Sequence, residues 1–105
     1  MDFATFTVVL LRRPADAPDL PEHELDRIQA EHLAYMQAQR ASGVLLANGP
    51  FRDQDDIALR GACVYALGLE EARAVAAQDP AVVARRLEPV LLTWLCPPGL
   101  ARFGA

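Results

Sequence analysis

The sequence lacks the features that mark membrane-spanning or secreted proteins. No apolar run in its 105 residues approaches the roughly 20 residues that a membrane-spanning helix needs. The first residues are not expected to act as a secretory signal, because the second residue is acidic and Arg12 and Arg13 follow the apolar stretch instead of preceding it. We therefore expect a cytoplasmic protein with no membrane partner.

Cysteine and histidine are too few and too scattered for most metal or redox sites. Cys63 and Cys96 show neither metal-ligand nor redox-motif spacing, and both lie in apolar runs, so we expect two buried thiols. His23 and His32 are too far apart in register to form a metal pair on one helical face. The sequence also has no glycine-rich phosphate loop and no serine at a nucleophile elbow. It predicts neither a metal nor an organic cofactor.

Basic residues are outnumbered and are not clustered. Ten basic residues stand against 14 acidic ones, for a net charge of -4, and adjacent arginines occur only at 12–13 and 85–86. This is a poor match for nucleic acid, whose phosphates favour a clustered basic face. Apolar residues make up 52% of the chain, which is enough for the core of one domain over residues 1–105.

The apolar periodicity alternates between strands and helices. Strands are predicted at residues 5–11, 44–51, 58–67 and 89–98, helices at 22–41 and 69–80, and one further helical turn within 81–87. The β-α-β-β-α-β order is typical of an α+β, ferredoxin-like fold with a four-stranded antiparallel sheet.

Three local signals define the predicted helix ends. Asp19 and Glu22 are spaced as a capping box for the first helix, and Gly43 is expected to end it. Asp79 is expected to end the second helix, because the residue before Pro80 is disfavoured in the helical conformation.

The first and last predicted strands are apolar on both faces. Two helices cover only one face of a four-stranded sheet, and soluble monomers rarely expose a large apolar patch on the other. A second copy packed face to face, about 10 Å away, would cover it. The sequence therefore predicts a homodimer.

His32 stands in an apolar helical stripe, where the pattern favours leucine. It is either a core histidine paired with neighbouring polar groups or a functional group, since an unpaired buried imidazole nitrogen costs about 1–3 kcal/mol. Asp79 can reach the first helix if both helices pack on one sheet face, and a carboxylate there would fix the imidazole tautomer. The alternative for Asp79 is an ordinary helix-ending residue.

The stretch "ANGPF" and the residues after it form a second candidate region. Gly49, Pro50 and Phe51 either form a simple strand-ending turn or let the backbone approach a small ligand. Asp53 or Arg60 would then supply polarity, although Arg60 also fits a solvated position at a sheet edge.

The segments "VVLLRR", "AEHLAYMQAQRASGVLLANGPF", "RGACVYAL" and "LEEARAVAAQDPAVVARRLEPVLLTWL", in this order, resemble the YCII-related (YciI-like) proteins over residues 6–98. The resemblance implies a ferredoxin-like fold that pairs into a dimeric α/β barrel. It also implies a histidine–aspartate active site, carried over by position to His32 and Asp79, with residues 49–51 lining the cleft.

The resemblance leaves three functional classes open. The first is a cofactor-independent isomerase or lyase in which His32 moves a proton on a small cyclic or aromatic substrate and Asp79 orients it. Some members of the family remove chloride from a hydroxyquinol-type ring. The second is a non-catalytic dimeric protein that binds a small ligand or acts as an accessory protein. The third is a cofactor-free monooxygenase.

Overall fold

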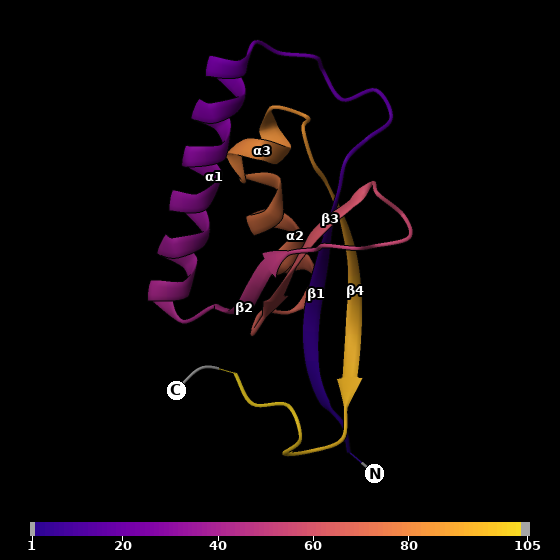
Figure 1. Ribbon diagram of the computed structural model, residues 1–105. Coiled ribbons are helices and arrows are strands. Elements are labelled where there is room, and N and C mark those ends of the chain that lie inside the picture. Colours follow the sequence, from indigo (N-terminus) through magenta and orange to yellow (C-terminus); the bar gives the residue numbers. More distant parts are fainter. Residues whose placement is uncertain (1, 104–105) are drawn as a thin grey trace.

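A four-stranded antiparallel sheet forms one layer of the molecule (Figure 1). The computed structural model describes residues 2–103, and in it the strands follow the order β2-β3-β1-β4. The strands are β1 (Ala4–Arg12), β2 (Leu45–Pro50), β3 (Leu59–Tyr65) and β4 (Glu88–Cys96). The predicted α+β, ferredoxin-like fold is confirmed, and each predicted strand overlaps an observed one.

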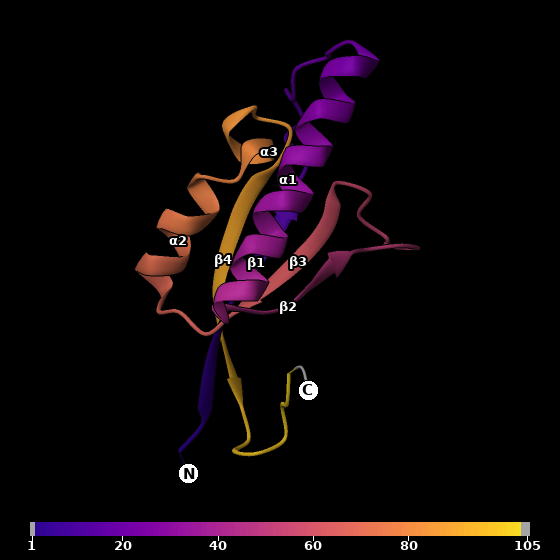
Figure 2. The same ribbon diagram turned by 90° about the vertical axis from the view of Figure 1, so that its left-hand side faces the viewer.

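All the helices lie on the same face of this sheet (Figure 2). They are α1 (Glu22–Ser42), α2 (Leu69–Ala77) and the short α3 (Pro80–Val83), which is the further helical turn expected within residues 81–87. Among residues 2–103, no helix is long and apolar enough to cross a membrane. The helical layer brings α1 and α3 side by side, although they are far apart in the sequence.

The core lies between the helices and the central strands. Val9 of β1 pairs with Cys63 of β3 and with Leu91 of β4, so these side chains share the face that the helices cover. The buried apolar cluster is completed by Leu11, Met36, Leu45, Tyr65, Ala72 and Ala76. Cys63 and Cys96 are both buried and unpaired, as expected.

The ends of α1 test two predictions with opposite outcomes. Gly43 ends the helix in the left-handed conformation, with φ of 86°, as predicted. The predicted capping box is wrong: Pro21 occupies the N-cap position, and no side chain caps this end. Asp19 lies before the N-cap, so its carboxylate is displaced from the amides that a capping box would satisfy.

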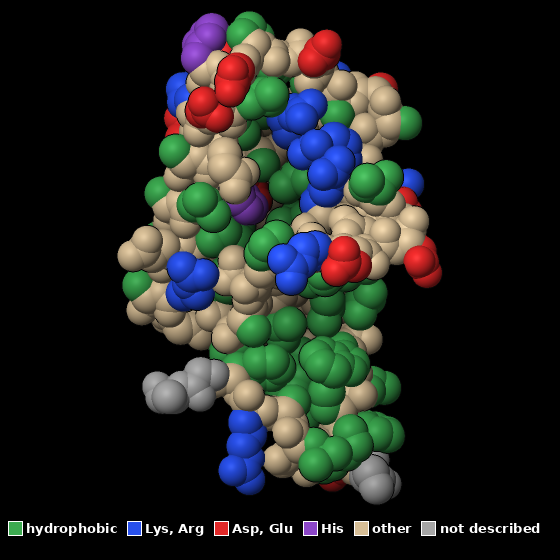
Figure 3. All heavy atoms as spheres, viewed as in Figure 1, with side chains coloured by type: hydrophobic (Ala, Val, Ile, Leu, Met, Phe, Trp, Pro, Cys, Tyr) green, Lys and Arg blue, Asp and Glu red, His purple; other side chains and the backbone are tan. Residues whose placement is uncertain are grey.

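The sheet face turned away from the helices is apolar and largely open. Val90, Leu92 and Trp94 alternate along β4 on this face, and Trp94 is 44% exposed. In Figure 3, hydrophobic side chains gather at the end of the molecule where β1 and β4 extend beyond the helices. Phe6 packs there against Trp94 and Phe103, with ring centroids 6.3 and 5.1 Å apart.

Candidate active site

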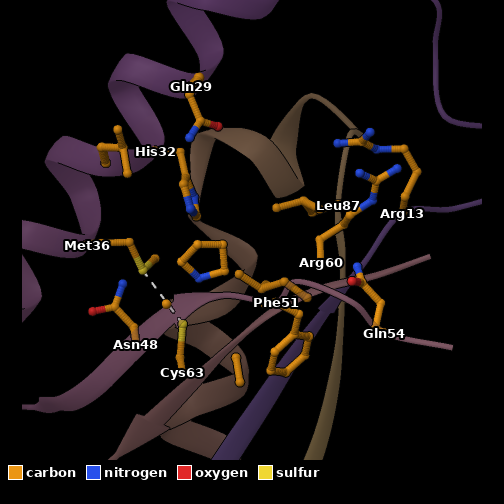
Figure 4. Close-up of a pocket in the computed structure, with 16 residues that line it drawn as sticks. Arg13, Gln29, His32, Met36, Asn48, Phe51, Gln54, Arg60, Cys63 and Leu87 are labelled. Atoms are coloured by element: carbon orange, nitrogen blue, oxygen red, sulfur yellow. Dashed lines mark hydrogen bonds between the residues drawn. The ribbon is translucent and has the colours of Figure 1, made fainter. Parts of the chain in front are cut away.

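A cavity of about 330 Å³ opens between α1, the adjoining ends of β2 and β3, and the segment that joins these two strands. One of the two histidines is recessed in this hollow in Figure 3, with arginine side chains on one side of it. Figure 4 shows the polar side chains of the wall and the apolar and sulfur-containing side chains at the base. The cavity is open to solvent, so a small molecule can enter without a change in the fold.

His32 is placed at the wall of this cavity by α1. Its Nδ1 lies 2.8 Å from both carboxylate oxygens of Asp79, and its side chain is 13% exposed. His32 is therefore neither sealed in the core nor fully solvated. The apolar stripe predicted around it consists of Leu25, Ile28, Leu33, Tyr35 and Met36. Ile28 and Met36 are buried as expected, but Leu33 is exposed and lies at the cavity.

Asp79 is held from the opposite side by the start of α3. The structure corrects its predicted position: α2 ends at Ala77, and Asp79 is instead the N-cap of α3. Its side chain accepts a hydrogen bond of 2.9 Å from the backbone N–H of Ala81 and is 1% exposed. A buried carboxylate is costly unless it is paired, and here the amide and the imidazole both stabilise it.

The paired carboxylate determines which nitrogen of His32 can act. Nδ1–H donates to Asp79, so in the neutral ring Nε2 carries the lone pair and points away from the carboxylate. His32 lines the cavity, so this nitrogen is the one available to a ligand. A histidine held in this way has the geometry of a general base, with Nδ1 bound by the carboxylate and Nε2 free to accept a proton.

The base of the cavity is apolar and chemically quiet. The thiol of Cys63 contacts the sulfur of Met36 at 3.7 Å, and both residues are buried. Burial raises the pKa of Cys63 from its ordinary 9.0 to about 11, so the thiol stays protonated at neutral pH. Because the thiolate is the nucleophilic form, Cys63 is not placed as a nucleophile.

Tyr35 lies behind the pair and is also kept protonated. Its hydroxyl donates a 2.7 Å hydrogen bond to the carbonyl oxygen of Val75. Burial, followed by the negative charge of Asp79, raises the pKa of Tyr35. This tyrosine therefore fixes α1 against α2 and does not compete with His32 for a proton.

The structure places four of the five predicted ligand-contacting residues at the cavity. Gly49, Pro50, Phe51 and Arg60 line it. Asp53 does not: its side chain is 90% exposed, its backbone has φ of 64°, and its carboxylate faces the neighbouring Arg52. Asp53 follows residues 49–51 closely in the sequence, but the turn directs its side chain into solvent and away from the cavity.

Gly61 has a structural role at the same wall that the sequence did not indicate. A Cβ built there would lie 2.7 Å from the carbonyl oxygen of Gly49 and 3.3 Å from Cα of Pro50. Glycine therefore lets β2 approach β3 closely at the cavity. Gly49, in contrast, has nothing within 4 Å of an added Cβ.

Four polar residues that sequence reasoning missed also line the cavity: Arg13, Gln29, Asn48 and Gln54. Arg13 follows β1 directly, and its backbone N–H donates to the carbonyl of Ala58, just before β3. Knowledge that β1 pairs with β3 would have placed Arg13 near Arg60. The sequence around Arg13 does not by itself indicate this pairing, so its place at the cavity was not predicted. Within residues 2–103, no group of three or more His, Cys, Asp or Glu side chains is arranged to hold a metal ion.

A histidine–aspartate pair at the wall of a small open cavity on a ferredoxin-like fold defines a small-molecule site. A family profile for the YCII-related domain matches residues 6–91, so the chain belongs to the YCII-related family. No curated protein matches the sequence.

One similar solved structure is 5-chloro-2-hydroxyhydroquinone dehydrochlorinase from Burkholderia phenoliruptrix AC1100, in complex with 2,5-dihydroxybenzoquinone. The similarity covers 87% of this chain and 93% of that chain, with a TM-score of 0.55 and 21% sequence identity. At this identity the likeness supports the fold.

Proposed function

We propose that this protein is a cofactor-independent enzyme of the lyase or isomerase type that moves a proton on a small cyclic or aromatic molecule. The observation that carries the proposal is the hydrogen bond between His32 Nδ1 and the buried carboxylate of Asp79, at the wall of an open cavity. The dehydrochlorinase with a similar fold acts on a ring of the size that such a cavity admits.

In the proposed mechanism His32 is the general base. Nε2 takes a proton from a carbon or hydroxyl group of the substrate, and the carboxylate of Asp79 stabilises the imidazolium that forms. In a lyase reaction, the electron pair of the broken bond forms a new π bond while the leaving group departs with its own bonding pair. In an isomerase reaction, the imidazolium returns the proton to a different atom of the same molecule.

The test is a screen of small lactones and hydroxylated or chlorinated aromatic compounds, followed by NMR in deuterated buffer. The wild-type protein is expected to exchange a substrate hydrogen, release chloride or form an isomer. His32→Gln is expected to lower the rate by about 10²-fold or more, because general-base catalysis contributes 10²–10⁴-fold. Asp79→Asn should lower it less, since an amide still orients the ring but does not stabilise its charge.

His23→Gln is the matched control. His23 lies on the first turn of the same helix, its side chain is 80% exposed and it does not line the cavity, so its replacement should leave the rate unchanged. Ligands that bind with no turnover, and equally well to wild type and His32→Gln, would assign the protein to the non-catalytic binding class instead.

We also propose that the protein is a homodimer in which two sheets pack face to face as a dimeric α/β barrel. The supporting observation is the row of exposed apolar side chains on the sheet face that the helices leave open, which includes Leu92 and Trp94. Soluble monomers rarely expose such a patch.

A further inference from the structure

Two arginines at the cavity have no acidic partner. Arg13 and Arg60 both line it, and within residues 2–103 neither guanidinium forms an ion pair. Arg13 Nε donates to the backbone carbonyl of Arg86 at 3.1 Å, which holds the side chain but leaves its charge uncompensated. The side chain of Arg60 makes no hydrogen bond within the described residues.

Most arginines elsewhere in the described residues pair with an acidic side chain. Five of them lie within 4.0 Å of a carboxylate: Arg12, Arg27, Arg52, Arg73 and Arg85. The chain as a whole is acidic, with a net charge of -4. Acidic partners are therefore not scarce, and the positive charge at this cavity is a local feature of the wall.

The two guanidinium groups lie side by side on the wall opposite His32 (Figure 4). The pKa of Arg13 is lowered, first by burial, then by the positive charge of Arg86 and then by that of Arg60. Arg86 does not line the cavity, but the positive charges of Arg13 and Arg60 repel one another there, and an anion bound between these two guanidinium groups would offset that repulsion. Four acidic side chains lie in this region: Asp26 lines a neighbouring hollow with Arg13 and Arg86, Asp79 is buried at His32, and Asp56 and Glu88 both pair with Arg12.

We propose that the ligand of this cavity is a small planar organic acid, and that Arg13 and Arg60 bind its anionic oxygens while His32 faces its ring. The position of His32 against the ring rests on the proposed function. The binding of the anion by the two arginines does not, because it requires no turnover.

The chemistry of the wall fits a carboxylate or an ionised ring hydroxyl. A guanidinium offers planar, paired donors that match two oxygens of a delocalised anion, and such charge-assisted hydrogen bonds are about twice as strong as neutral ones. The cavity volume of about 330 Å³ suits a single ring. Gln54, on the same wall, adds a neutral polar group, although its Nε2 donates to the carbonyl of Leu59.

The test compares benzoate with benzamide, which have the same shape and differ in charge. NMR titration of the full chain should show benzoate shifting resonances of the cavity residues at millimolar concentration, with affinity at least about tenfold above that of benzamide. Arg60→Gln should remove most of this preference. Added salt should weaken benzoate binding and leave benzamide binding unchanged.

Arg52→Gln is the matched control, because Arg52 carries the same charge on a 93% exposed side chain that does not line the cavity. It should leave benzoate affinity intact. Equal affinities for benzoate and benzamide, equal losses in the two arginine variants, no benzoate binding, or equally tight binding of inorganic sulfate would each overturn the proposal.

His32→Gln separates this inference from the proposed function. If benzoate still binds this variant and Arg60→Gln loses it, the anion site is established whether or not the protein turns over any substrate. If turnover is found and depends on His32 but a neutral substrate is preferred, the proton-transfer function stands and the anion site is rejected.

Discussion

Asp79 has two contacts that belong to different parts of the structure. One carboxylate oxygen caps α3 through the amide of Ala81, and both oxygens lie within hydrogen-bond distance of His32. A single side chain therefore connects the start of a short helix to the candidate base. A substitution at Asp79 therefore affects both the stability of the fold and the environment of His32, and different substitutions can distinguish the two effects.

Replacing Asp79 should reveal these two contacts as separate losses of stability. We expect Asp79→Ala to lower the free energy of unfolding by about 3 kcal/mol, since it leaves a buried imidazole nitrogen and a helix amide without partners. Asp79→Asn keeps an oxygen that can cap α3 and should recover about 1 kcal/mol of this loss. Denaturation in urea measures both variants, and equal losses would show that the cap contributes nothing.

Gly61 and Gly49 provide a matched pair at the wall of the cavity. Gly61→Ala should lower the free energy of unfolding by about 1–3 kcal/mol, because its Cβ would meet the backbone of β2 and not a movable side chain. Gly49→Ala meets nothing within 4 Å and should stay within about 0.5 kcal/mol of wild type. Thermal unfolding of the two variants decides this, and similar melting temperatures would contradict the prediction.

At the scale of the elements, β3 carries two buried groups that resist losing their protons. Burial raises the pKa of Cys63 to about 11 and also raises that of Tyr65, whose hydroxyl donates to Gln39 at 2.6 Å. All ten basic residues of the chain are arginine, so no lysine titrates in the same alkaline range. Among the described residues with a raised pKa in this range, Tyr35 of α1 is the one that lies outside β3.

The stability that depends on these protons should be present below pH 9 and be lost as the pH rises from about 9 to 11. In this range the unfolded chain loses the Cys63 proton while the folded protein keeps it, so the unfolded state is favoured by about 2–3 kcal/mol in all. Urea denaturation at a series of pH values measures the slope, with Tyr65 contributing in the same direction. Cys63→Ala should reduce the slope and leave the part that comes from the tyrosines, and an unchanged slope in this variant would rule out the thiol as a cause.

The elements show how far local patterns predict this protein. The strands and helices follow from alternation and helical periodicity, and Gly43 ends α1 because only a left-handed residue fits there. The capping box fails because Pro21 moves the helix start away from Asp19. Arg13 and Gly61 escape prediction for a related reason: their roles depend on which strands lie side by side, and that is a property of the assembled sheet.

At the scale of the whole molecule, the open sheet face predicts how the chain associates. If the homodimer forms through this face, Leu92→Glu should place an unpaired charge in the interface and convert the protein to a monomer, because burying such a charge costs several kcal/mol. Sedimentation equilibrium distinguishes the two states.

Ile57→Glu is the control for this change, since Ile57 is also an exposed apolar residue but lies between β2 and β3 and not in β4. It should leave the association state as it is in wild type. A dimer that survives Leu92→Glu, or a wild-type protein that sediments as a monomer, would refute packing through this face.

The segment between β2 and β3 contributes Phe51 and Gln54 to the cavity, whereas His32 and Asp79 come from the helical layer. Part of the cavity wall and the histidine–aspartate pair therefore come from separate stretches of the chain. The contact between His32 and Asp79 involves no residue of the segment 51–58, so we expect it to survive an exchange of this loop. In a fold built in this way, changes to one loop can alter which small molecules fit the cavity without any change to the histidine or the aspartate.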